Sequence, residues 1–164
     1  MSKNECVTCC KLNIKGTEID VAEEIEKIVH FIVSMEREQL KLHGFTITQS
    51  RCLIKLSRYQ SISMNELSEY MHLDKSTMTR IIATLEKNNF ITKDKCTEDK
   101  RITYISLTGI GQEAALKIRN MFGEYYTRVI SHIPFGKIDT VIDSLFIFLD
   151  AITKAKSEMH TSEK

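Results

Sequence analysis

The segment from Ser63 to Leu85 restricts the possible folds of this 164-residue chain more than any other stretch. Ser63 followed by Glu66 is a capping box, which predicts that a short helix begins there. Residues 72–74 form a turn, and a second helix follows it because apolar residues recur at helical spacing: Met78, Ile81, Ile82 and Leu85. Two helices joined by a three-residue turn make a helix-turn-helix.

A β-hairpin is predicted directly after this motif. The helical pattern ends at Asn88 and Asn89, and residues 102–107 (ITYISL) show the two-residue alternation of a strand. The charged stretch KDKCTEDKR at 93–101 precedes that strand, so the hairpin has a charged tip. Upstream of the motif, a short helix capped by Thr48 is expected to turn three apolar residues inward: Leu53, Ile54 and Leu56.

Long amphipathic helices flank this central winged unit. Apolar residues spaced by three and four predict one helix from Thr17 to a stop at Gly44. Thr108 is expected to cap another, which ends before Pro134, and a last helix begins near Gly136. The chain then divides into five parts: a flexible Cys-bearing arm (1–16), a dimerisation helix (17–45), the winged helix-turn-helix unit (46–108), C-terminal dimerisation helices (109–157) and a tail (158–164).

The last helix carries too many apolar residues for a helix with one solvated face. Ten of the fifteen residues from Ile138 to Ile152 are apolar. The winged unit can cover only part of this surface. We therefore expect the flanking helices to pack against a second copy of the chain and to form a homodimer.

Composition agrees with a mainly α fold with a small β-wing, because the chain has only six Gly and one Pro. Lys and Arg number 23 against 22 Asp and Glu, so a polybasic coat is excluded and any nucleic-acid site must be concentrated. No apolar run approaches the ~20 residues of a membrane-spanning helix. The N-terminus has no apolar stretch of signal-peptide length, and a cytoplasmic location with reduced thiols is expected.

The stretch from Ile62 to Thr108 resembles the multiple-antibiotic-resistance regulator (MarR) family of bacterial transcription factors. The likeness rests on LDKST at 73–77, on LEK at 85–87, and on five residues around the wing: Asp99, Arg101, Ile105, Leu107 and Thr108. Flanking helices extend it to about residues 18–155. The resemblance implies a homodimeric winged helix-turn-helix regulator, expected to be a repressor, that binds a pseudo-palindromic DNA operator. Family members bind small aromatic or anionic effectors, or oxidants, in or near the crevice between dimerisation helices and winged unit.

The second helix of the motif is the predicted DNA-reading element. With the apolar stripe turned inward, the opposite face and the first turn present five polar residues: Lys75, Ser76, Thr77, Thr79 and Arg80. Hydroxyls and free N–H groups at a helix start can hold phosphate oxygens. The guanidinium of Arg80 can donate two hydrogen bonds to guanine in the major groove, so base specificity is expected to depend mainly on it.

The hairpin tip is the second predicted DNA contact. From Lys75 to Arg101 the chain has seven cationic and four acidic residues, and Lys95, Lys100 and Arg101 lie in the wing. Arg101 is the candidate for insertion into a narrow minor groove. By resemblance to the family, Asp99 pairs with Arg101 and fixes its direction.

Five cysteines raise the question of a metal or redox site. Cys6, Cys9 and Cys10 could hold a soft metal or metalloid or form a disulfide under oxidant, or they are incidental thiols on the arm. A zinc site would need further ligands nearby, and none is visible. Cys96 is expected to be exposed in the wing, where its oxidation would disturb DNA contact, and Cys52 is expected at the edge of the core.

No enzyme is expected, because the chain has no Gly-rich phosphate loop, nucleophile elbow or HExxH motif. The other class to consider is a winged-helix protein-interaction module without specific DNA binding. Such a module would keep the apolar stripes. It would not need Arg80 and Arg101 to project from one face.

Overall fold

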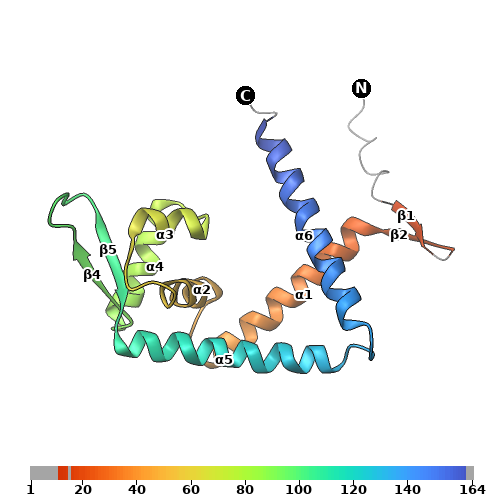
Figure 1. Cartoon of the computed structure of the whole chain (residues 1–164), viewed down its shortest axis with the longest axis horizontal. Helices are drawn as coiled ribbons and strands as arrows, with labels where there is room; N and C mark the ends of the chain where they lie inside the picture. The colour runs from red at the N-terminus through yellow and green to blue at the C-terminus, as the bar shows by residue number, and fades with distance from the viewer. Residues whose placement is uncertain (1–10, 15, 162–164) are drawn as a thin grey trace. The chain divides into compact units, whose positions relative to one another are not determined.

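The computed structural model describes residues 11–14 and 16–161 (Figure 1). The chain forms two compact units, residues 1–118 and residues 119–164. The boundary between them falls inside one long helix, α5 (Gly109–Ser131). All buried side chains among the described residues lie in the first unit, which also contains the predicted helix-turn-helix.

The first unit combines helices with two small antiparallel sheets. Strand β5 is central in the three-stranded sheet, whose order is β3-β5-β4, and Ile105 pairs with Ile62 on one side and Lys93 on the other. Figure 1 shows β4 and β5 as a long hairpin, the wing. Before α5 the elements are β1 (Lys11–Ile14), β2 (Thr17–Asp20), α1 (Val21–Leu42), α2 (Ile47–Leu56), β3 (Ile62–Ser63), α3 (Met64–Met71), α4 (Lys75–Lys87), β4 (Ile91–Lys95) and β5 (Thr103–Leu107).

The N-terminal segment differs from the prediction, because residues 17–20 are a strand and not the start of a helix. Strand β2 pairs with β1 in a hairpin, so residues 11–14 of the predicted arm are also regular structure. Gly16 provides the turn with φ +86°, and its N–H donates to Asn13 Oδ1. Helix α1 begins after Asp20, whose carboxylate accepts from the backbone N–H groups of Ala22 and Glu23.

The start of α2 also differs from the prediction. Thr46, and not Thr48, caps the helix, because its hydroxyl accepts from the N–H of Gln49 while the Gln49 side chain accepts from the N–H of Thr46. This reciprocal arrangement is a capping box. The sequence contains the Thr-x-x-Gln pattern at 46–49, so the position could have been recognised from the residues alone.

One apolar core in the first unit is built from side chains of α1 to α4, the first part of α5 and the three-stranded sheet. The inward stripe of α4 is confirmed for Met78, Ile82 and Leu85, which are buried, while Ile81 is half-buried. Burial of each large apolar side chain stabilises the fold by roughly 1.5–3 kcal/mol relative to exposure. The other fully buried large side chains include Leu40, Leu53, Leu56, Leu67, Ile105 and Ile118.

Thr108 joins the start of α5 to the turn between α4 and β4. Its hydroxyl donates to the carbonyl of Asn89 at 2.6 Å and accepts from the N–H of Gly111 at 3.0 Å, so the predicted cap is confirmed. The Thr108 N–H donates to the carbonyl of Phe90 at 3.0 Å. Gly111 packs so tightly there that a Cβ atom would lie 1.9 Å from the Phe90 carbonyl oxygen.

The second unit consists of the rest of α5 and α6 (Ile138–Thr161), which extends past residue 157, where the sequence predicts a tail. Among its described side chains, residues 119–159, none is buried. Large apolar side chains of α6 are exposed along its length, with Leu145 at 58% and Ile147 at 72%. Within the described part of the chain, no helix is both long enough and apolar enough to span a membrane.

Candidate nucleic-acid interface

The helix-turn-helix is fixed by side chains that cap both helices. Ser63 and Glu66 form the predicted capping box of α3, and Asp74 caps α4 by accepting from the Thr77 N–H at 2.9 Å. These hydrogen bonds hold the pKa of both carboxyl groups below its usual value. Between the helices, His72 has φ 51°, a left-handed conformation that ends α3 and turns the chain sharply.

The polar face of α4 is exposed, as predicted. Lys75, Ser76, Thr79 and Arg80 are accessible, and Thr77 is half-buried. Arg80 Nη2 donates to Thr77 Oγ1 at 3.3 Å, which directs the guanidinium along the first turn of the helix. The Thr79 hydroxyl donates to the Lys75 carbonyl and can still accept a hydrogen bond. This face therefore presents the guanidinium group of Arg80 beside the hydroxyl groups of Thr77 and Thr79.

The wing exposes Lys95, Lys100 and Arg101. Asp99 acts differently from the expectation, because its Oδ1 accepts from the backbone N–H of Arg101 at 2.9 Å. No ion pair joins the two side chains among the described residues. Since the Ile102 N–H also donates to the Asp99 carbonyl, Asp99 fixes the backbone turn of the wing and not the Arg101 guanidinium.

A small hollow lies between the start of α3, helix α4, which is the predicted DNA-reading helix, and the wing. It has a volume of about 100 Å³, and Lys75 of α4 and Arg101 of the wing both line it. The other polar side chains that line it are Ser63 and Asn65 at the start of α3 and Thr103, the first residue of β5. Two of the predicted DNA-contacting cations thus converge, although they are far apart in sequence.

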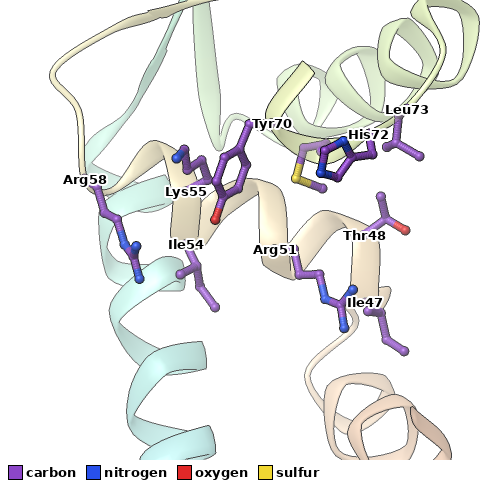
Figure 2. Close-up of a pocket in the computed structure, with 10 residues that line it drawn as sticks. Ile47, Thr48, Arg51, Ile54, Lys55, Arg58, Tyr70, His72 and Leu73 are labelled. Atoms are coloured by element: carbon purple, nitrogen blue, oxygen red, sulfur yellow. The ribbon is translucent and has the colours of Figure 1, made fainter. Parts of the chain in front are cut away.

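A larger cavity of about 380 Å³ lies on α2 and the end of α3 (Figure 2). Three cationic residues line it, Arg51 and Lys55 of α2 and Arg58 just after the end of that helix. The other lining residues include Tyr70 and the apolar side chains of Ile47, Ile54, Met71 and Leu73. The cavity can therefore present positive charge beside apolar and aromatic surface. Such a lining suits a small anionic molecule with an apolar body.

Sequence reasoning missed this cavity, although a pattern for it exists. Arg51 and Lys55 are four residues apart, which places them on one side of α2, and Arg58 follows three residues later in the turn after the helix. The Lys55 ammonium lies 3.2 Å from the centre of the Tyr70 ring, a cation–π contact between α2 and α3. Arg51 forms an ion pair with Glu36 of α1 at 3.5 Å.

The described cysteines are chemically unlike. Cys52 is completely buried, deeper than the core edge predicted for it, and burial raises the pKa of its thiol to about 12. Cys96 is half-buried and not fully exposed as predicted. Cys6, Cys9 and Cys10 lie outside the described residues, so their role stays a prediction. Within the described residues, no group of three or more His, Cys, Asp or Glu side chains could hold a metal ion.

Comparison with known proteins agrees with this geometry. The model of the MarR family matches residues 45–103, which run from the residue before the α2 cap to the first residue of β5. Over this segment the chain is similar to the MarR family. The matched segment contains the helix-turn-helix, the cavity on α2 and α3, and most of the wing.

Curated relatives of this chain are HTH-type transcriptional regulators. An uncharacterized regulator of Bacillus subtilis, YwaE, is 27% identical over 99 residues, which are 60% of this chain and 58% of that protein. SarZ of Staphylococcus epidermidis is 29% identical over 82 residues, 50% of this chain and 55% of SarZ. The aligned part thus spans somewhat more than half the length of either relative.

Solved structures share the fold over a longer stretch. MepR, a transcription regulator of the Staphylococcus aureus multidrug efflux pump MepA, has a TM-score of 0.71 at 17% identity. The alignment covers 82% of this chain and 99% of MepR. A MepR–DNA complex gives a TM-score of 0.70 at 18% identity over the same shares of the two chains. At these identities the likeness shows a common fold.

Proposed function

We propose that this protein is a sequence-specific DNA-binding transcriptional regulator of the MarR family that acts as a repressor. The observation that carries the proposal is the exposed polar face of α4, where Arg80 stands among hydroxyl groups on a helix held by two capped ends. Such a helix fits the major groove, and the wing beside it adds cations for the backbone or the minor groove.

The relatives and the fold support this assignment. The curated relatives are regulators by name, and a protein of the same fold has been solved in complex with DNA. A protein-interaction module would not require a positively charged helix face next to a cationic wing.

Substitution of Arg80 tests the proposal. Arg80→Ala should lower affinity for the duplex that the wild type selects from a random-sequence pool by ~1–3 kcal/mol, with base preference relaxed at one position per half-site. Arg119→Ala, an exposed arginine of the second unit, is the matched control and should leave both unchanged. Equal affinity and equal base preference for wild type and Arg80→Ala would contradict the assignment of this face.

A homodimer is the assembly that the second unit supports. The exposed apolar residues of α6 need a cover, and a second copy of α6 provides a chemically matched one. Two copies would read half-sites about one helical turn apart, ~34–36 Å, because both recognition helices must enter successive major grooves. Cross-linking or light scattering of the full chain measures this state directly.

The cavity on α2 and α3 is the proposed effector site. Its three cations and its aromatic wall favour a small anionic molecule with an apolar body, which would press on the contact between α2 and α3. Benzoate should release the selected duplex from the wild type and act less strongly on Arg58→Gln, while acetate serves as the control without a ring. The alternative proposal is a soft metal, metalloid or oxidant at Cys6, Cys9 and Cys10. It predicts a response that is lost on replacing all three by Ser.

A further inference from the structure

The wing is attached to α4 by a turn and, farther along β4, by an ion pair. In the turn, Asn89 has φ 58°, and the N–H of Phe90 donates to the carbonyl of Leu85 at 2.9 Å. In the ion pair, the ammonium of Lys93 in β4 lies 2.5 Å from a carboxylate oxygen of Glu86 in α4. Two separate attachments fix the angle between a helix and a hairpin, whereas a single one acts as a hinge.

Lys93 extends from the inner face of the wing. It pairs with Ile105 of β5 across the sheet, and Ile91 precedes it by two residues in β4. Alternate residues of a strand share a face, and directly paired residues share it as well. Ile91 and Ile105 are buried, so Lys93 is on the side of the sheet that packs on the core. It is half-buried, whereas Lys95 is exposed.

Glu86 is an acidic residue on the DNA-reading side of α4. It follows Thr79 by seven residues, about two turns of the helix, so both residues lie on the same side. An unpaired carboxylate at this position would be repelled by the phosphates of a bound duplex. The Lys93 ammonium compensates this charge from the side of β4. The ion pair therefore neutralises the carboxylate and holds the wing with the same contact.

We propose that Glu86 and Lys93 are positioning residues that set the angle between α4 and the wing, so that Arg80 and Arg101 can bind one duplex together. The proposal rests on the proposed DNA-binding function and deepens it. Neither member of the pair needs to touch DNA. Since α4 is anchored by its buried stripe and the wing tip is not, a change of angle should weaken the contact of Arg101 before that of Arg80.

Variants that conserve net charge test the proposal, because they separate loss of the contact from a change in electrostatic attraction to DNA. Glu86→Gln combined with Lys93→Gln should lower affinity for the duplex that the wild type selects from a random-sequence pool. The expected loss is roughly two- to fivefold, which is typical of a partly exposed ion pair. The reversed pair, Glu86→Lys with Lys93→Glu, should recover most of this affinity, and Lys93→Arg should retain it.

Direct contact of Lys93 with a phosphate predicts a different pattern. The neutral double variant would then lose about 0.9 of the slope of log K against log salt concentration, and the reversed pair would bind more weakly than the neutral one. The positioning role predicts an unchanged slope. A lower slope, or a reversed pair that is weaker than the neutral pair, would overturn the proposal.

Base preference separates positioning from a general loss of stability. In the neutral double variant, the A·T preference that depends on Arg101 should weaken, while the base choice that depends on Arg80 should persist. A merely structural role would lower affinity for all sequences alike and would lower the temperature of thermal unfolding to match. Equal weakening of both preferences, or preferences identical to those of the wild type, would contradict the positioning role.

A measurement without DNA tests the pair independently of the proposed function. Backbone amide order parameters should fall in β4 and β5 of the neutral double variant and stay unchanged in α4. Lys154→Gln is the matched control, because it breaks the exposed ion pair of Lys154 with Asp150 in α6 and should leave the wing and the base preference unchanged. Unchanged order parameters in the wing would overturn the proposal by themselves. Failure of the wild type to select any duplex would contradict the proposed function.

Discussion

The winged part of the first unit and helix α6 of the second contain similar apolar residues but place them differently. In the first unit, side chains such as Leu53, Ile82 and Ile105 are completely inaccessible to solvent. In α6, residues of the same types are exposed, among them Leu145 and Ile147. The difference lies in how far each part covers its own apolar side chains, since the winged unit buries them fully whereas no described side chain of α6 is buried.

This contrast separates two kinds of stability in one chain. The winged unit should retain its fold at any protein concentration, because its core contacts are internal. The second unit should gain stability with concentration, because a partner that covers its apolar surface stabilises it by mass action. Regulation that acts on one unit can therefore leave the other folded.

The largest expected effect compares two isoleucines. Ile82→Ala removes buried atoms from the core and should lower the free energy of unfolding by ~2–5 kcal/mol at every concentration. Ile147→Ala should change it by at most ~0.5 kcal/mol in dilute solution and by more when the protein is concentrated. Urea unfolding at two protein concentrations measures both. Equal losses in dilute solution would show that α6 is buried within a single chain.

A pair of glycines in α5 gives the next effect. Gly111→Ala should destabilise the first unit by about 1–3 kcal/mol, because the new Cβ would collide with the backbone oxygen of Phe90. Gly123→Ala should stabilise α5 by ~0.5–1 kcal/mol in a single chain, since no atom lies within 4 Å of its added Cβ and Ala favours a helix. A loss of stability in Gly123→Ala would indicate that a partner packs against this position.

The smallest effect concerns acid. Asp74 and Glu66 have folded pKa values below their ordinary 3.8 and 4.5, so their contribution is present above those ordinary values and is lost as pH falls through the lowered ones. Unfolding of the first unit should therefore become easier below about pH 4. Asp74→Asn keeps a capping oxygen that does not titrate and should flatten this decline. An unchanged pH profile in the variant would contradict the role of Asp74.

The helix-turn-helix could be predicted from the sequence because its signals are local. The capping box of α3 and the apolar stripe of α4 need only a few neighbouring residues, and both are confirmed. The helix start at Thr17 was wrong because amphipathic spacing does not show where a helix begins, whereas the Asp20 cap does. The hollow and the cavity depend on which elements meet in space, and no local pattern fixes that for Lys75 and Arg101.

Thr108 links the turn that follows α4 directly to the beginning of α5. Thr108 forms three hydrogen bonds there, with the backbone groups of Asn89, Phe90 and Gly111. Gly111 also lies so close to the Phe90 carbonyl that a methyl group would not fit between them. We therefore expect a displacement of the first turn of α5 to be transmitted directly to the end of α4, the helix that is proposed to read DNA.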